Sequence, residues 1–561
     1  MEYFFYCEKE GGLKPSKRIG TIILLSILSV SLIWIFWLSL TPIIDRDGTR
    51  FHLPFARLWA ENSFLYFRPY FAYYDLNMLN LDWIYMLIFK SGLPDQLTKI
   101  IHALFLPAGG FLMFRYFKRK YGLNWGLLAF IFFITIPINI RLASEVYVDL
   151  ALLFFSTLSL IYFVKWFESD MTSKKYLIIS ALGAGMAFGT KYNGMVFAFF
   201  ISLFTALAVS REKKDDKKSV KSILLYVFII FICVSPWLTR NFINSGNPFF
   251  PLFDSVFKSD LSMPDELIKN VSGETAWRIV ENNDNFFTLL LLPVRLFFEG
   301  EDHNFLKFDG VLNPILLLLL IFLPLRGFRE SANGKLCLYM FALFAIIYMT
   351  TLYSNNIRVR YFISVIPILV FLNIEVIKYL SKNTNTYFSI FIIPSLFLIY
   401  NLIYSINFSG NLHIIEYNPF SKESKTDYMK KYLRQYDNIE FINNNTPRDA
   451  VIYEAFTGGR SYYIQRTFFS DTNPLDRYLL SLASEGASKE RYQLFFKDLP
   501  NCDLKATHLF IKTNDFIQTF FNMNADKMRE ENKIKLSGFI EFINSLKLLK
   551  YDGATFIYEI N

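Results

Sequence analysis

Long apolar runs recur along this chain and constrain its fold more than any other feature. A helix needs about 20 mostly apolar residues to cross the hydrocarbon core of a bilayer. Of the 561 residues, 53% are hydrophobic and 18% are aromatic, more than is usual for a water-soluble domain. Applied along the chain, the length rule predicts about eleven membrane-spanning helices, near residues 19–41, 100–117, 123–141, 147–166, 176–190, 194–210, 221–239, 309–325, 336–353, 361–379 and 387–405.

Positive charge collects in the short segments between alternate runs. Cytoplasmic loops of membrane proteins carry an excess of Lys and Arg, so these segments indicate the orientation of the chain. This interpretation accounts for the net charge of +9 without a nucleic-acid partner. We expect residues 1–18 in the cytoplasm, in a protein of the cytoplasmic (inner) membrane, with the C-terminal region on the extracytoplasmic side. The basic segments are "RYFKRKYG", "ESDMTSKK", "REKKDDKKSVK", "RGFRESANGK" and "KYLSKN".

Composition changes after residue 405 from apolar to mixed and polar. We therefore predict a transmembrane domain over residues 19–405, with external loops at 42–99 and 240–308, and an extracytoplasmic α/β domain over 406–561. The expected fold class is a polytopic all-α membrane bundle carrying this small α/β domain. Within it, periodicity predicts helices at 426–442 and 533–546 and strands at 450–456, 461–469, 507–513 and 554–560.

Two external stretches, residues 81–89 and 286–298, are apolar but too short to span a bilayer. Helices of this kind commonly lie along the membrane surface, with aromatic rings at the level of the lipid headgroups. We expect that placement for both stretches. The alternative is that they enter the bundle as half-helices.

Ionisable residues follow several spans, and the predicted topology puts them all at the outer face. Each has a simpler structural explanation, because "DRDG" favours a turn and a carboxylate can cap a helix. His52 could serve only in packing, the cations could be interfacial anchors, and Glu145 reads as a solvated loop charge. The residues are Asp45, Asp47 and His52 after the first span, Glu145 and Asp149 before the fourth, and Lys191, Arg240, Arg358 and Arg360 beside later spans.

Together these charges suit one kind of chemistry. A carboxylate in a partly desolvated pocket has a raised pKa and becomes a stronger general base, while nearby cations can hold a phosphate. Sugar transfer from a lipid phosphate needs both functions. Paired external carboxylates could also hold a divalent metal, although oxygen ligands alone do not select one; no other cofactor is indicated.

Five stretches resemble, in the same order, segments of the GT-C superfamily of bacterial membrane glycosyltransferases. The resemblance is greatest to the branch of protein O-mannosyltransferases and the lipid A aminoarabinose transferase, and it covers residues 19–375. It differs at Phe51, where family members often carry Tyr before the first-loop His. The stretches are "DGTRFHLPFARLWAENSF", "ASEVYVDLALLFF", "GAGMAFGTKYNGM", "SPWLTRNFINSGNPFFP" and "RYFISVIPILVFL".

The resemblance implies an inverting transfer of a sugar from a polyprenyl-phosphate carrier to a hydroxyl of a glycan, lipid or protein acceptor. The first-loop acid of the family corresponds to Asp47, with Asp45 as its rival, and the second acid corresponds to Asp149. We take these three as catalytic candidates. Candidates for substrate binding are His52, Tyr147, Lys191, Arg240, Arg358 and Arg360.

Three other functions compete with this hypothesis. A transporter or flippase of lipid-linked sugars would also contain ionisable residues within a helical bundle, but with charges along a path and commonly an inverted repeat. An O-antigen ligase or polymerase would concentrate its acceptor-binding features in one late external loop. A structural membrane protein would use the C-terminal region only to bind a partner.

Overall fold

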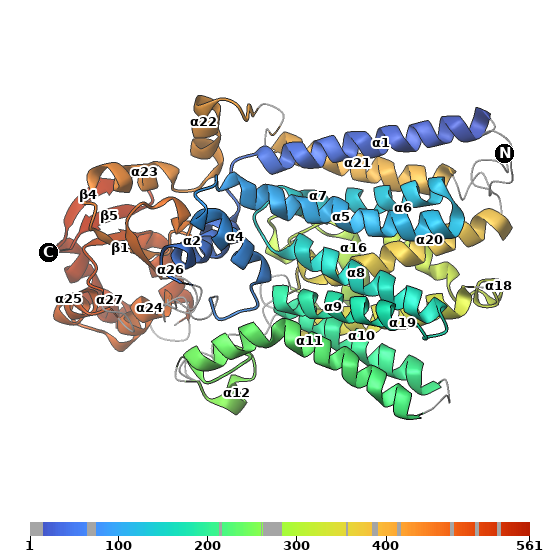
Figure 1. The fold of residues 1–561 in the computed structure, drawn as a ribbon. Coiled ribbons are helices and arrows are strands. Elements are labelled where there is room, and N and C mark those ends of the chain that lie inside the picture. Colours follow the sequence, from blue (N-terminus) through green and yellow to red (C-terminus); the bar gives the residue numbers. More distant parts are fainter. Residues whose placement is uncertain are drawn as a thin grey trace.

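The computed structural model divides into a bundle of long helices and a domain built on a β-sheet (Figure 1). It describes residues 15–63, 75–211, 216–259, 261, 283–331, 333–354, 357–383, 391–411, 414, 417–471, 476–499, 504–523 and 529–560. The segment 1–14, parts of the predicted loops 42–99 and 240–308, and the start of the predicted span 387–405 lie outside these residues.

The bundle follows the apolar runs of the sequence, because each long helix overlaps one predicted span. Among the described residues, seven helices are long and apolar enough to cross a membrane, or eight if the bent pair α6–α7 counts as one span. The protein is therefore a multi-pass membrane protein, but the predicted count of about eleven spans is not confirmed. The helices of the bundle, including α9 and α21, which are not among those counted, are α1 (Pro15–Leu40), α5 (Gln96–Tyr121), α6 (Leu123–Thr135), α7 (Pro137–Ala143), α8 (Asp149–Glu168), α9 (Lys174–Thr190), α10 (Tyr192–Arg211), α11 (Asp216–Ser245), α19 (Gly334–Ser354), α20 (Ile366–Asn383) and α21 (Ile393–Asn411).

Breaks and short pieces explain most of the difference in count. Pro137 has no N–H and holds the preceding residue in an extended conformation, so α6 and α7 meet at a bend of 65°. The predicted span 309–325 forms only the short helix α17 (Ile315–Leu318) and the 3-10 helix η5 (Leu319–Phe322). Helix α9 has 17 residues, slightly fewer than a full span requires.

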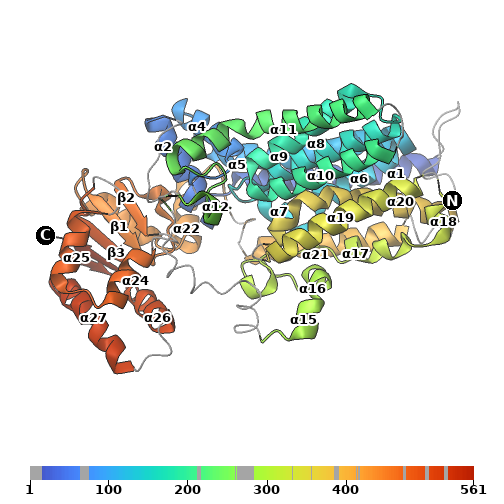
Figure 2. The same ribbon diagram turned by 90° about the horizontal axis from the view of Figure 1, so that it is seen from below.

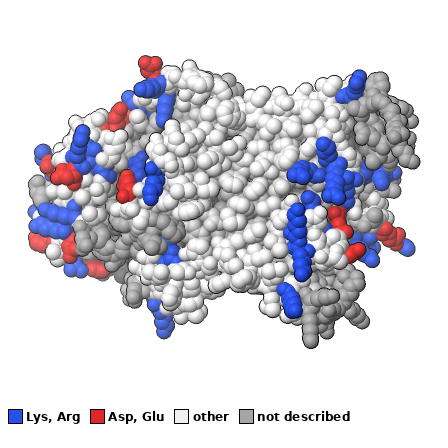
Figure 3. Space-filling view, in the orientation of Figure 1, with Lys and Arg blue, Asp and Glu red and all other residues white. Residues whose placement is uncertain are grey.

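Burial separates the centre of the bundle from its margin. The most apolar part of the span formed by η6 (Val359–Val365) and α20 is 94% buried, whereas the most apolar parts of α1 and α11 are only 22% buried. On the face drawn in Figure 3 a belt without charged residues crosses the bundle, and Lys and Arg gather at the end where α1 begins. Since exposed apolar helix faces require lipid around them, this belt marks the part of the surface that faces the bilayer.

Short helices lie at the end of the bundle that faces the sheet domain (Figures 1 and 2). The predicted helix at 81–89 is confirmed as α4 (Asn80–Lys90), which packs against α2 (Leu53–Glu61). The predicted helix at 286–298 is two helices, α15 (Phe286–Leu290) and α16 (Leu292–Phe298), and Phe286 and Phe287 are more than 70% exposed. Other short elements are the π-helix η2 (Gly48–His52), α12 (Asp254–Phe257) and η4 (Phe305–Lys307). Helix α18 (Arg326–Arg329) lies at the opposite end of the bundle (Figures 1 and 2).

The C-terminal domain, from Lys422 onward, contains a five-stranded sheet in the order β2-β1-β3-β5-β4. Strands β2, β1 and β3 run parallel, and β5 and β4 continue antiparallel. The strands are β1 (Val451–Ala455), β2 (Thr467–Asp471), β3 (His508–Ile511), β4 (Lys547–Tyr551) and β5 (Phe556–Glu559). The covering helices are α22 (Lys422–Tyr432), α23 (Tyr436–Asn445), α24 (Asp476–Glu485), α25 (Lys489–Lys497), α26 (Thr513–Met523) and α27 (Arg529–Asn544).

The predictions for this domain are confirmed in part. The strands expected at 450–456, 507–513 and 554–560 and the helix at 533–546 are present. The single helix expected over 426–442 is wrong, because the left-handed backbone of Gln435 separates α22 from α23. The strand expected over 461–469 is also partly wrong, since its first residues form the 3-10 turn η8 (Ser461–Tyr463).

Candidate active site

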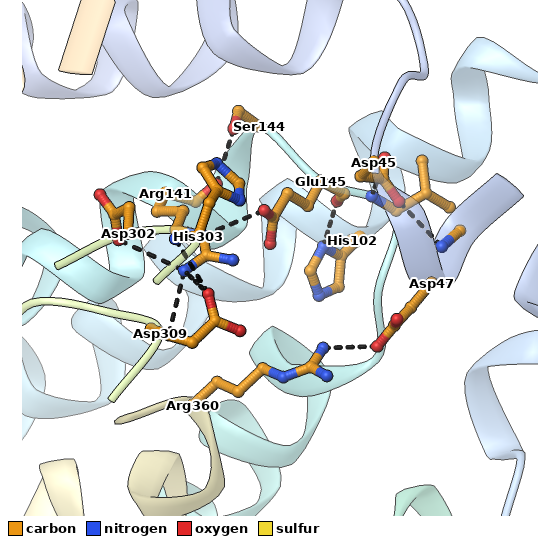
Figure 4. Close-up of polar contacts among 12 residues, drawn as sticks. Asp45, Asp47, His102, Arg141, Ser144, Glu145, Asp302, His303, Asp309 and Arg360 are labelled. Carbon is orange, nitrogen blue, oxygen red and sulfur yellow. Dashed lines mark hydrogen bonds and ion pairs between the residues drawn. The ribbon is translucent and has the colours of Figure 1, made fainter. Parts of the chain in front are cut away.

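The first ion pair of the candidate site joins the loop after α1 to the start of η6. Asp47 Oδ2 accepts a hydrogen bond from Arg360 Nη1 at 2.6 Å, across 313 residues of sequence (Figure 4). The Arg360 guanidinium also lies over the rings of Tyr147 and Tyr361, 4.9 and 5.4 Å from their centroids. The resemblance predicted both residues, and the fold brings them into contact.

This contact changes the chemistry expected of Asp47. Burial opposes ionisation, but the Arg360 guanidinium, with smaller contributions from His52 and Lys191, holds the pKa of Asp47 well below its usual range. The expectation of a raised pKa is therefore wrong for this carboxylate. With the Arg360 guanidinium beside it, Asp47 is ionised but only weakly basic.

A second ion pair lies beside the first. Asp149 is the first residue of α8 and is 1% exposed, and its Oδ1 accepts a hydrogen bond from Lys191 Nζ at 2.8 Å. Lys191 occupies the extended break between α9 and α10, and its ammonium lies 5.2 Å from the centroid of the Tyr361 ring. Tyr361 thus contacts the cations of both pairs. The capping-only explanation of Asp149 is wrong, because its carboxylate accepts from Lys191.

His52 belongs to the same site through a partner that the sequence analysis missed. Its Nδ1 lies 2.6 Å from Oδ1 of Asp82, a fully buried carboxylate on α4. Burial works against protonation of His52, but the adjacent Asp82 carboxylate raises its pKa above the usual value. Asp82 stands inside the apolar run "LDWIYMLIF", and a carboxylate in such a run was a signal that could have identified it.

Asp45 has a different environment from Asp47. Its two oxygens accept hydrogen bonds from the backbone N–H groups of Gly48 and Val146, at 2.9 and 3.0 Å. The side chain therefore forms the expected turn and also fastens this loop to the one between α7 and α8. A Cβ at Gly48 would lie 2.1 Å from Asp45 Oδ2, so the turn requires glycine. Burial raises the pKa of Asp45.

Glu145 is not the solvated charge that we expected, because it is 5% exposed. It belongs to a buried network centred on Arg141, which also contacts Asp302 and Asp309 at 3.3 and 2.8 Å (Figure 4). Burial raises the pKa of Glu145 to about 8, even though the Arg141 guanidinium acts in the opposite direction. The Arg141 network supports the loop that carries Tyr147 and Asp149.

Two predicted cations have partners other than the central pairs. Arg240 donates to both carboxylate oxygens of Asp75 at 3.0 Å and lies over the ring of Trp59, so it is engaged within a buried ion pair. Burial raises the pKa of Asp75 to about 6, against the effect of Arg240. The Arg358 guanidinium lies 4.3 Å from the centroid of the Phe305 ring and 5.9 Å from that of Tyr361, at the edge of the site.

Among the residues that the structure describes, no three His, Cys, Asp or Glu side chains are grouped so as to hold a metal ion. The charged groups of the site instead form cation–carboxylate pairs, in which Arg360 and Lys191 each bind one carboxylate. A phosphate that entered between these cations would accept charge-assisted hydrogen bonds from both.

The chain matches a protein family in sequence and several solved proteins in structure. Residues 88–367 match a family described as "Domain of unknown function (DUF8201)". No curated protein matches the chain in sequence.

Solved structures give a more informative comparison. The crystal structure of ArnT from Cupriavidus metallidurans bound to undecaprenyl phosphate is similar with a TM-score of 0.55 at 12% identity, covering 96% of this chain and 98% of that one. Its apo structure gives 0.54 at 12% identity, covering 97% and 99%. The Archaeoglobus fulgidus oligosaccharyltransferase, tethered to an acceptor peptide, gives 0.49 at 14% identity, covering 96% and 74%.

The similarity to ArnT extends over both the helical bundle and the C-terminal domain, since nearly all of each chain is covered. The motifs "DGTRFH", "EVYVD", "GTKY" and "RYF" of this chain lie together at one end of such a bundle. The chain therefore has the same overall fold as the ArnT structures.

Proposed function

We propose that the protein is an inverting glycosyltransferase, which moves a sugar from a polyprenyl-phosphate carrier to a hydroxyl group of an acceptor. The observation that carries this proposal is the meeting of the pairs Asp47–Arg360 and Asp149–Lys191 around Tyr361, in a chain with the same overall fold as the ArnT structures. The charges lie at one end of the bundle rather than along a path through it, which favours transfer over transport.

A lipid phosphate is the donor group that suits these cations. The ArnT structure was determined with undecaprenyl phosphate bound, which supports a carrier of this type. Arg360 and Lys191 would bind the phosphate oxygens, and Arg358 would extend the positive edge of the site. In doing so the phosphate competes with Asp47 for the Arg360 guanidinium.

This competition couples donor binding to the activation of the base. With Arg360 turned toward phosphate, Asp47 loses the interaction that lowers its pKa and becomes a stronger general base. It then takes the proton of the acceptor hydroxyl. The hydroxyl oxygen bonds to the anomeric carbon from the face opposite the phosphate, and the bond from that carbon to the phosphate oxygen breaks.

The other residues of the site would orient the reactants. Asp149 fixes the Lys191 ammonium, and Asp82 fixes the imidazole ring of His52, so both groups are held in place before the donor arrives. Tyr147 and Tyr361 present aromatic faces on which a sugar ring could pack. A general base typically contributes a factor of about 10² to 10⁴ to the rate.

The site would operate at the outer face of the cytoplasmic membrane. The gathering of Lys and Arg at the end where α1 begins favours a cytoplasmic location for that end, with the site and the C-terminal domain outside (Figure 3). A carrier lipid could then keep its chain in the bilayer while its phosphate reaches Arg360.

Transfer of label from a polyprenyl-phosphate sugar, in membranes containing the protein, tests the proposal. Asp47→Asn should lower the rate by a factor of about 10² to 10⁴, while the control Glu301→Gln removes an exposed carboxylate of the same end and should leave the rate unchanged. A wild-type rate for Asp47→Asn removes the base role. Label that crosses the membrane without joining an acceptor would instead support the flippase.

Comparison of the glycolipids and glycans of cells with and without the protein, by mass spectrometry, would identify the sugar and the acceptor. A product that disappears with the protein and returns with the wild type, but not with Asp47→Asn, is the expected result. Identical profiles under conditions in which the protein is present would contradict the proposal.

A further inference from the structure

The segment that connects α1 to the Asp45–Asp47 turn is not helical, so its carbonyl groups need partners from elsewhere. Those of Thr41 and Pro42 accept hydrogen bonds from the Lys99 ammonium at 2.9 and 3.2 Å, and Thr41 also accepts from the side chain of Gln96. Both donors lie near the start of α5. Helix α5 therefore fixes the first half of this connecting segment.

The second half of the connecting segment is fixed by the C-terminal domain. The carbonyl of Ile43 accepts from the hydroxyl of Tyr463 at 2.9 Å, and the carbonyl of Ile44 accepts from the guanidinium of Arg460. The next residue is Asp45, whose side chain binds Val146, and Asp47 follows two residues later. Every carbonyl from Thr41 to Ile44 is thus held by a side chain of another element.

The donors from the C-terminal domain are themselves held firmly. Glu454, buried near the end of β1, accepts hydrogen bonds from the hydroxyl groups of Thr457 and Ser461. Left-handed conformations at Phe456, Gly458 and Gly459 allow the chain to reverse immediately after the strand. This turn connects the sheet to η8 and so presents Arg460 and Tyr463 to the connecting segment.

We propose that Arg460 and Tyr463 are positioning residues for Asp47, so that the C-terminal domain forms part of the active site. The proposal rests on the proposed function, in which Asp47 is the base. If the C-terminal domain only docked onto the bundle, it would not need hydrogen bonds to the backbone of the segment next to Asp47. The interface between the domain and the bundle already contains other contacts that could hold the domain in place. Tyr462, for example, donates to Asp95 at 2.9 Å.

This neighbour supplies a matched control. Tyr463→Phe and Tyr462→Phe each remove one hydroxyl from the same interface, but only the first hydroxyl bonds to the connecting segment. In the full-length protein we expect Tyr463→Phe to lower kcat for sugar transfer by about tenfold, with an unchanged KM for the lipid donor, because misplacement of a catalytic group reduces the rate strongly. Tyr462→Phe should keep the wild-type kcat.

Hydrogen exchange followed by mass spectrometry gives a readout that does not depend on activity. The amides of Gly48 and Thr49 donate to Asp45, so they should exchange faster in Tyr463→Phe than in Tyr462→Phe. Arg460→Gln should show the same acceleration and serves as a second variant. Equal exchange and equal kcat in both tyrosine variants would overturn the proposal, as would an equal loss in both.

Failure of the proposed function would look different. If the wild type shows no transfer from any polyprenyl-phosphate sugar, the proposed function is wrong and Asp47 has no role as a base. Faster amide exchange at Gly48 and Thr49 in Tyr463→Phe would then show only that the C-terminal domain stabilises this loop. If the wild type is active and Asp47→Asn is inactive, the comparison of the tyrosine variants decides the further inference alone.

Discussion

Replacement of Lys191 by Met should destabilise the protein strongly, because it leaves a buried carboxylate without its cation. Asp149 is 1% exposed, and its Oδ2 accepts no hydrogen bond from the described residues. The ammonium of Lys191, 2.8 Å from the other oxygen, therefore provides the main compensation for burying this charge.

The size of the effect follows from this geometry. At the 2.8 Å separation of the two charged atoms, Coulomb attraction with an effective dielectric constant of about 20 amounts to about 6 kcal/mol. The side chain of Lys191 is 22% exposed, so solvent screens part of this attraction. Removal of one partner from a buried ion pair typically costs about 3–5 kcal/mol, and we expect Lys191→Met to lower the free energy of unfolding by that amount.

The double variant Asp149→Asn/Lys191→Met separates charge from packing. An amide at position 149 carries no charge to desolvate, so the double variant should recover most of the lost free energy of unfolding. The assay is equilibrium unfolding in mixed micelles of dodecyl maltoside and SDS, followed by tryptophan fluorescence. A stability of Lys191→Met equal to that of the wild type, or a double variant no more stable than the single one, would refute this reasoning.

Two other buried groups give predictions that can be checked in the same micelles. Burial raises the pKa of Glu145 from 4.5 to about 8, so the folded protein retains a proton that the unfolded chain releases, and this contribution to stability is lost as the pH rises through about 8. Glu145→Gln should therefore flatten the fall of the melting temperature between about pH 5 and 8; an unchanged slope would contradict the assignment. Arg240→Met should lower the free energy of unfolding by about 3–5 kcal/mol, because it leaves the buried Asp75 carboxylate without its cationic partner. The double variant Arg240→Met/Asp75→Asn should recover most of that loss, and donor KM should be unchanged where the variant folds; a raised KM would instead support phosphate binding by Arg240.

The bundle could be predicted from the sequence because apolar length is a local property. Most long runs in the sequence became long helices, and the basic segments between the runs indicated one end of the molecule. The number of spans could not be predicted equally well, since Pro137 and the short α17–η5 segment shorten helices without interrupting the apolar pattern.

Pairing within the site depends on contacts between distant residues, and local pattern does not encode them. Asp47 and Arg360 are 313 residues apart in the sequence. From the sequence, only the resemblance to a family placed both residues in one active site. Arg240 was expected to bind phosphate because of its flanking motif, but Asp75 occupies its guanidinium. Glu145 was judged by its loop position, whereas its burial arises from Arg141 and the distant segment that carries Asp302 and Asp309.

The burial of the η6–α20 span has a consequence for how the host membrane influences the protein. The most apolar part of the span Val359–Lys382 is 94% buried, and Arg360, near the start of this span, is itself buried, whereas the corresponding parts of α1 and α11 are only 22% buried. Changes in acyl-chain length or fluidity therefore act first on the two peripheral helices. Other parts of the protein separate the Arg360 guanidinium from the lipid. Substitutions in α1 and α11 would therefore adapt the protein to a colder or thicker bilayer without altering the candidate active site.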